Sequence, residues 1–171
     1  MRAPWGRRSA VLPEGIRSIL ALDPGERVLG AASDDAGTVL VGTTTHLCAV
    51  AGTEVLLRRP WHLVDSARWD DQRSSLAVTW VDGGRRAGWV LGEAAGLLQV
   101  LRERVQASVV LAESVDLGPG RTARVVIRRD LAGGELLGQT ILGRGVRPDD
   151  PEAVEATEAA LAGVREQVGL D

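Results

Sequence analysis

Short β-prone runs alternate with turn signals from Asp23 to Leu91, and this alternation constrains the fold more than any other feature of the sequence. Most runs are rich in Val, Leu, Thr or Trp and are bounded by Gly, Pro, Asp or Ser. The pattern therefore predicts seven short antiparallel strands. They are Arg27 to Ala32, Thr38 to Thr43, His46 to Val50, Glu54 to Leu57, Leu63 to Trp69, Leu76 to Val81 and Ala87 to Leu91.

The hydrophobic period changes from two residues to about 3.6 directly after these strands. Leu76 to Val81 alternates strictly, and Asp82-Gly83 is typical of a tight hairpin turn. From Ala94 to Val105 the apolar residues instead share one helical stripe, which predicts a helix from about Glu93 to Ala107. Strands followed by a long helix place the chain in the α+β class.

The last third of the chain repeats this change of period. Ser108 to Val115, Thr122 to Arg129 and Glu135 to Leu142 predict three further strands. A second long helix is predicted from Asp150, which can cap it, with Pro151 in its first turn. In the middle strand Ala123, Val125 and Ile127 alternate with Arg124, Val126 and Arg128, which predicts one buried face and one mostly solvated face.

These patterns divide the chain into three parts. Residues 1–22 form a tail with one short helix between Pro13 and Leu22, residues 23–107 form the seven-stranded part, and residues 108–171 form a βββα extension. The extension is too short to bury much core alone, so we expect it to pack on the preceding part. Its strands either continue the sheet of that part or pair with a second copy, which would give a homodimer.

Composition excludes several classes of protein. All 20 basic residues are Arg, and Lys, Asn, Phe and Tyr are absent, which indicates the codon bias of a high-GC genome. A hydrophobic content of 44% excludes a disordered chain. The single Cys48 excludes a disulfide scaffold and fits a reducing cytoplasm. No run is long enough for a signal peptide or a transmembrane helix.

Seven antiparallel strands closed by one amphipathic helix resemble a bacterial pleckstrin-homology-like (PH-like) domain, of the type found in small uncharacterised actinobacterial proteins. The resemblance covers residues 23–107. It rests on Gly25 to Leu29, Thr38 to Thr43 with His46 to Val50, and Pro60-Trp61 with Val64 to Trp69. It implies a seven-stranded antiparallel β-barrel capped by a C-terminal helix, which binds phosphoinositides, peptides or proteins rather than catalysing a reaction.

The loop between the first two predicted strands disfavours phosphoinositide binding. Lipid-binding members of the family place basic residues there, whereas Ser33 to Gly37 contains two carboxylates and no Arg. An anionic headgroup is repelled by such a loop.

Residue types that carry catalysis occur here in contexts typical of structural roles. Neither His46 nor His62 adjoins a Ser in a nucleophile turn, and Cys48 lies in an apolar run. Three acidic pairs fall at turns or at a helix cap. They are Asp34-Asp35, Asp70-Asp71 and Asp149-Asp150. The sequence therefore predicts no enzyme, no catalytic residue, no metal ligand and no cofactor.

Clustered arginines mark the candidate interaction surface. It consists of Arg58, Arg59, Arg85, Arg86, Arg124 and Arg128. We expect a cytoplasmic protein-interaction module of unknown role; the alternative is a small regulatory or nucleic-acid-associated protein that uses this Arg-rich surface. The net charge of −3 and the lack of aromatics among the arginines of the extension favour the first. We expect four tryptophans in the core or at its rim, namely Trp61, Trp69, Trp80 and Trp89.

Overall fold

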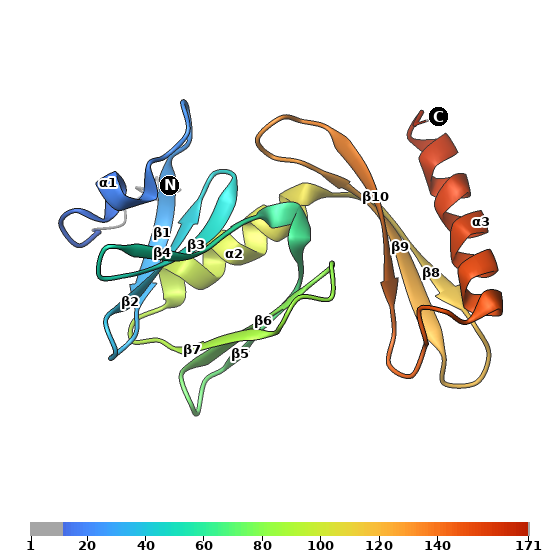
Figure 1. The fold of residues 1–171 in the computed structure, drawn as a ribbon, viewed down its shortest axis with the longest axis horizontal. Coiled ribbons are helices and arrows are strands. Elements are labelled where there is room, and N and C mark those ends of the chain that lie inside the picture. Colours follow the sequence, from blue (N-terminus) through green and yellow to red (C-terminus); the bar gives the residue numbers. More distant parts are fainter. Residues whose placement is uncertain (1–11, 171) are drawn as a thin grey trace, which may run out of the picture.

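A computed structural model describes residues 12–170 and contains ten strands and three α-helices in that range (Figure 1). The strands are β1 Val28–Ser33, β2 Thr38–Thr43, β3 His46–Ala51, β4 Glu54–Pro60, β5 Val64–Asp70, β6 Ser75–Trp80, β7 Ala87–Val90, β8 Val109–Asp116, β9 Thr122–Arg129 and β10 Leu136–Leu142. The helices are α1 Ile16–Leu20, α2 Ala95–Ser108 and α3 Pro151–Gln167, with a 3-10 turn η1 at Trp61–Leu63. All ten predicted strands and all three helices are present, so the α+β class is confirmed.

The strands form three antiparallel sheets. Their orders are β1-β2-β3-β4, β5-β6-β7 and β10-β9-β8. The predicted seven-stranded barrel is not confirmed, because no ladder joins β4 to β5 in the described residues and the chain crosses between them through η1. The first two sheets meet at one corner, where Asp34 bridges Leu91 and Gly92 N donates to Ser33 O at 3.0 Å.

Helix α2 lies between the first two sheets and supplies one side of the main core (Figure 1). Leu97, Val100 and Leu101 of α2 are buried against both sheets. Gly30 and Gly42 are partners in the register of β1 and β2, and a Cβ on Gly42 would lie 2.8 Å from Val100 Cγ1. The two glycines therefore allow the helix to approach the sheet closely.

Helix α1 covers the opposite face of the first sheet. Ile16 and Leu20 pack with Val39, Val41 and Cys48, all of which are buried. This second layer explains why β2 and β3 are continuous apolar runs, since they are buried on both faces. The predicted tail before this helix falls mostly in residues 1–11, outside the described residues.

The tryptophans confirm the prediction for the core. Trp61 is fully buried and Trp80 is 6% exposed, whereas Trp69 and Trp89 are partly buried and pack against the same cluster. The Trp61 indole Nε1 donates to Thr43 O at 3.0 Å, which ties η1 to the first sheet.

The extension forms the third sheet, and α3 packs on one face of it (Figure 1). Asp150 caps α3 as predicted, because its Oδ1 accepts from Glu152 N at 3.1 Å. The third sheet continues neither of the other two in the described residues, and a homodimer through its strands stays a prediction. No helix in the described residues is long and apolar enough to cross a membrane.

The prediction of a mostly solvated second face on β9 is wrong for two of the three residues of that face. Val126 is 1% exposed and Arg128 is 2% exposed, whereas Arg124 is exposed. Arg128 is buried because its guanidinium contacts Val64 at the start of β5. The alternation of residue types along β9 could not reveal that a distant segment covers it.

Candidate functional site

A groove of about 420 Å³ separates β5 from α2. Ala67 and Trp69 face this groove, because the register pairs them with Val78 and Leu76 of the buried face of β6. The lining residues are Asp65, Ser66, Ala67, Trp69 and Leu76 from the sheet and Leu98, Leu101, Arg102, Val105 and Gln106 from the helix. Most of the wall is therefore apolar, and the sequence prediction did not include it.

Strand β5 is an edge strand beside this groove. Its only hydrogen-bonded neighbour in the described sheets is β6. The main-chain groups on its other side are therefore free of ladder partners, which is the arrangement that lets another strand add to a sheet. Ala67 is small and exposed although its side chain faces the helix, so the groove is open at this position.

The charges around the groove are unequal. Arg102 on the helix is exposed and forms no ion pair with any residue in the range 12–170. Asp65 on the strand is paired, because Arg124 Nη2 donates to its Oδ1 at 2.6 Å. The groove therefore offers an unneutralised cation and no unneutralised anion.

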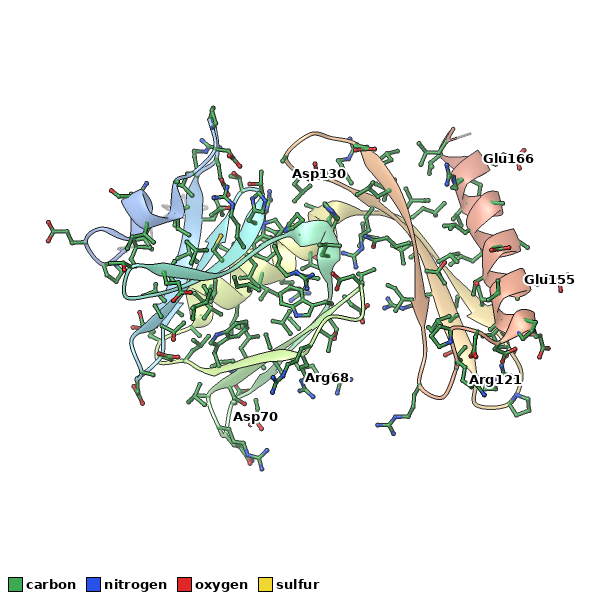
Figure 2. All side chains as sticks on the ribbon, in the orientation of Figure 1. Arg68, Asp70, Arg121, Asp130, Glu155 and Glu166 are labelled. Carbon is green, nitrogen blue, oxygen red and sulfur yellow. The ribbon has the colours of Figure 1, made fainter. Side chains whose placement is uncertain are left out.

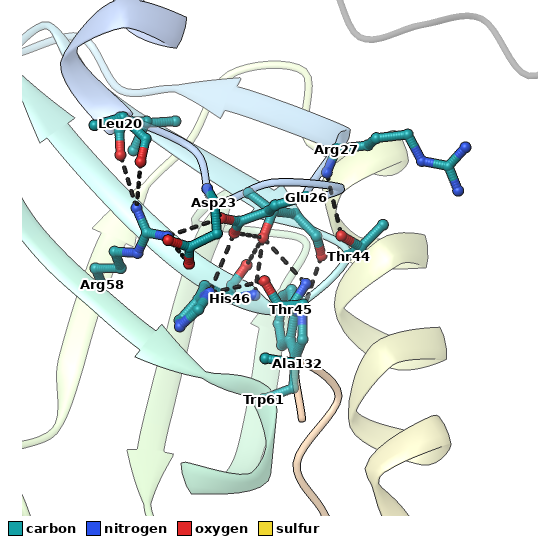
Figure 3. A network of polar contacts seen from close by, with 12 residues as sticks. Leu20, Asp23, Glu26, Arg27, Thr44, Thr45, His46, Arg58, Trp61 and Ala132 are labelled. Atoms are coloured by element: carbon teal, nitrogen blue, oxygen red, sulfur yellow. Dashed lines mark hydrogen bonds and ion pairs between the residues drawn. The ribbon is translucent and has the colours of Figure 1, made fainter. Parts of the chain in front are cut away.

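A cluster of polar side chains, separate from the groove, lies beside α1 (Figure 3). Arg58 Nη2 donates to Asp23 Oδ2 and to Glu26 Oε2, both at 2.8 Å, and Arg58 Nη1 donates to Leu20 O at 2.7 Å. His46 Nδ1 lies 3.1 Å from Glu26 Oε1. This cluster joins the segment after α1 to β3 and β4.

Glu26 is ionised at the centre of this cluster although its side chain is only 1% exposed. Burial raises the pKa of a carboxyl, but here hydrogen bonds from the Thr43 hydroxyl, the Asp23 amide, Thr45 and His46 outweigh burial and lower the pKa of Glu26 to about 2. A carboxylate with so low a pKa is a weak base, so it is poorly suited to accept a proton near neutral pH.

The same cluster contains three potential metal-ligand atoms close to one another. One ligand atom each from Asp23, Glu26 and His46 lies within 4.8 Å of the others. However, the Arg58 guanidinium already contacts both carboxylates. A metal ion would have to displace this cation. The absence of a metal ligand stays a prediction from the sequence.

The six predicted arginines do not form one surface. Arg58 belongs to the polar cluster beside α1, and Arg128 is buried, where burial lowers its pKa. Arg59 pairs with Asp82 and lies 4.6 Å above the Trp80 ring, and Arg124 pairs with Asp65. Of these six, only Arg85 and Arg86 are both exposed and without an ion pair to any residue that the structure describes.

The other residues considered for chemistry are at least partly buried or lie at turns. Burial raises the pKa of the Cys48 thiol to about 12, and burial lowers the pKa of His62. Acidic side chains act at turns and caps: Asp34 Oδ1 accepts from Thr38 N at 2.7 Å, and Asp70 Oδ1 accepts from Gln72 N at 3.0 Å. Figure 2 shows Asp70 with Arg68 at the second sheet, far from Asp130 on the extension.

Comparison of the chain with protein-family models, with curated proteins and with solved structures gives no match. The groove between β5 and α2 is therefore interpreted from its own geometry. A sequence signal for it does exist, because Ala67 is a small residue at an inward-facing position between larger ones. The small side chain indicates a groove only when the position of α2 opposite it is also known.

Proposed function

We propose that this chain is a non-enzymatic protein-interaction module that binds an extended peptide segment of a partner protein along β5. The observation that carries the proposal is the free edge of β5 beside an apolar groove. In strand addition the main chain of the edge supplies hydrogen bonds, and the neighbouring pocket selects alternate side chains of the peptide.

The groove indicates the chemistry of that peptide. Apolar side chains at alternate positions would contact Trp69, Leu98 and Val105, because successive residues of a strand point to opposite faces. An acidic side chain is favoured next to Arg102, the unneutralised cation of the wall. The partner is therefore a segment of alternating apolar residues with at least one carboxylate.

We propose in addition that residues 23–107 form a PH-like domain. The order of four strands, three strands and one helix supports this assignment, as does the packing of α2 between the two sheets. The loop after β1 argues against phosphoinositide as its ligand, because Asp34 and Asp35 carry negative charge there. A cytoplasmic location stays a prediction from the sequence.

The alternative of a regulatory or nucleic-acid-associated protein has less support. A phosphate backbone needs several cations along one face. Arg128 is buried, and Arg58, Arg59 and Arg124 are paired with carboxylates. Arg86 lines a surface hollow with Arg68 and Arg73, but Asp70 and Asp71 line the same hollow and reduce its positive charge.

Selection from a display library of random dodecapeptides tests the proposed function. We expect the selected peptides to alternate apolar residues, to carry an acidic residue and to bind the purified protein. Ala67→Arg fills the groove and should weaken their binding by about 100-fold, the loss of a well-packed anchor. The matched control Val90→Arg adds the same side chain at an exposed position of β7 and should leave binding unchanged.

Two results would count against the proposal. One is a set of peptides whose affinity is the same for the wild-type protein and for Ala67→Arg. The other is binding of a DNA or RNA oligonucleotide that weakens steeply with salt, because that dependence reports phosphate contacts and favours the alternative function.

A further inference from the structure

The extension contacts the first residues of β5, the strand that borders the groove. Arg128 of β9 is 2% exposed, and its Nη2 donates to Val64 O at 3.1 Å. Its Nη1 donates to Ser108 Oγ at 2.9 Å, at the end of α2. One guanidinium therefore links the extension to both walls of the groove.

These contacts fall on an irregularity in β5. The pairing of β5 with β6 shifts between Val64 and Ser66, as at a β-bulge. A bulge leaves backbone groups without their regular ladder partners. Two side chains of the extension contact the strand at this point, since Arg128 binds the backbone carbonyl of Val64 and Arg124 binds the side-chain carboxylate of Asp65.

The rest of the seam between the extension and the preceding part is also mostly polar. Gln139 Nε2 donates to His62 O at 2.9 Å, and Leu131 packs against the main core. Figure 2 places Asp130 in the hairpin that reaches toward the first part of the chain. His62 Nδ1 lies 3.6 Å from Asp130 Oδ1, beyond hydrogen-bond distance.

Three buried atoms of this seam have no hydrogen-bond partner in the described structure. They are His62 Nδ1, Arg128 Nε and Gln139 Oε1. Each unpaired buried polar atom opposes docking. The extension is therefore held on β5 by few satisfied polar contacts. Removal of one of these contacts should have a measurable local effect.

We propose that Arg128 and Arg124 are positioning residues that hold the bulge of β5 and thereby fix the geometry of the peptide-binding groove. This inference rests on the proposed function for the role of the groove. The positioning itself can be measured without any peptide, so the two ideas can fail separately.

Amide hydrogen exchange of the full chain tests the positioning. In Arg128→Met we expect those amides between Asp65 and Trp69 that are hydrogen-bonded to β6 to exchange about tenfold faster, because the carbonyl of Val64 loses a hydrogen bond from a charged donor. Amides of β2 and β3 should keep their wild-type rates. Arg129→Met is the matched control, because Arg129 is the next residue on β9 and is exposed.

A second variant keeps the test decisive if Arg128→Met fails to fold. Arg124→Gln removes the ion pair to Asp65 from an exposed position, so it should fold and still accelerate the same β5 amides. If Arg128→Met and Arg124→Gln, or whichever of them folds, show unchanged amide exchange in β5, the inference is overturned. Equal acceleration over all strands would also overturn it, since that result indicates global destabilisation.

Peptides from the dodecapeptide selection then separate the inference from the proposed function. If the wild-type protein binds them, both variants should bind more weakly while Arg129→Met binds normally; equal binding by all would overturn the role of the extension at the groove. If no selected peptide depends on Ala67, the proposed function fails, and faster exchange in β5 would still support the positioning of β5 by the two arginines.

Discussion

Replacement of Glu26 by Gln should change how the stability of the protein depends on pH. The folded pKa of Glu26 is lowered from 4.5 to about 2, because hydrogen bonds from Thr43 and its neighbours outweigh the effect of burial. Between these two values the unfolded chain binds more protons at this site than the folded chain. Acidification therefore favours unfolding in that range.

The magnitude follows from the change in pKa. A difference of about 2.5 pH units at ~1.36 kcal/mol each corresponds to about 3 kcal/mol of stability. The Glu26 side chain is 1% exposed, so solvent screens it little. This contribution is fully present above the unfolded pKa, near 4.5, and is lost as the pH falls toward about 2.

Urea denaturation monitored by tryptophan fluorescence, repeated from about pH 6 to about pH 2.5, measures this effect. Glu26→Gln should be less stable than wild type near neutral pH, and the two stabilities should converge in acid. Glu54→Gln, at an exposed position of β4, should follow the wild-type curve. A stability difference between Glu26→Gln and wild type that stays constant over this range would show that the folded pKa of Glu26 is not lowered.

Two further predictions concern packing in the first sheet. Gly42→Ala should destabilise the protein by about 1–3 kcal/mol, because its Cβ would lie 2.8 Å from Val100 Cγ1. Chemical denaturation should show that Val100→Ala restores part of this loss, whereas Gly88→Ala, with its nearest atom at 3.6 Å, should show a much smaller change. The Cys48 thiol, which is buried with a pKa raised to about 12, should resist an alkylating reagent in the native state and react once urea unfolds the chain. Rapid alkylation without urea would contradict that placement.

Local patterns in the sequence were sufficient to predict the elements. Strict alternation identified β6, and the change to a 3.6-residue period identified α2, because both signals lie within one element. The cap by Asp150 was predictable for the same reason, since the capping residue and the amides it binds are neighbours. The closure of a barrel depends instead on pairing between β4 and β5, which no local pattern encodes.

The candidate sites depend on residues that are far apart in the sequence. Arg128 contacts Val64 across 64 positions, and Arg58 contacts Glu26 across 32. On a strand that alternates apolar and basic residues, Arg128 is typical of a solvated face. Only the position of the segment that leads into β5 shows that this guanidinium is buried, so the sequence prediction placed it on the surface.

Because every basic residue is Arg, each basic side chain can make several internal contacts at once. The number of charges alone does not show this. A guanidinium presents several donors in a fixed plane, whereas an ammonium is a compact point charge. Arg58 uses this plane to bind Leu20, Asp23 and Glu26 together, and Arg128 uses it to bind Ser108 and Val64. This chain has no Lys, and an Arg that makes several internal contacts contributes less to the solvent-exposed positive charge. The number of arginines therefore overstates the basic surface of the described residues.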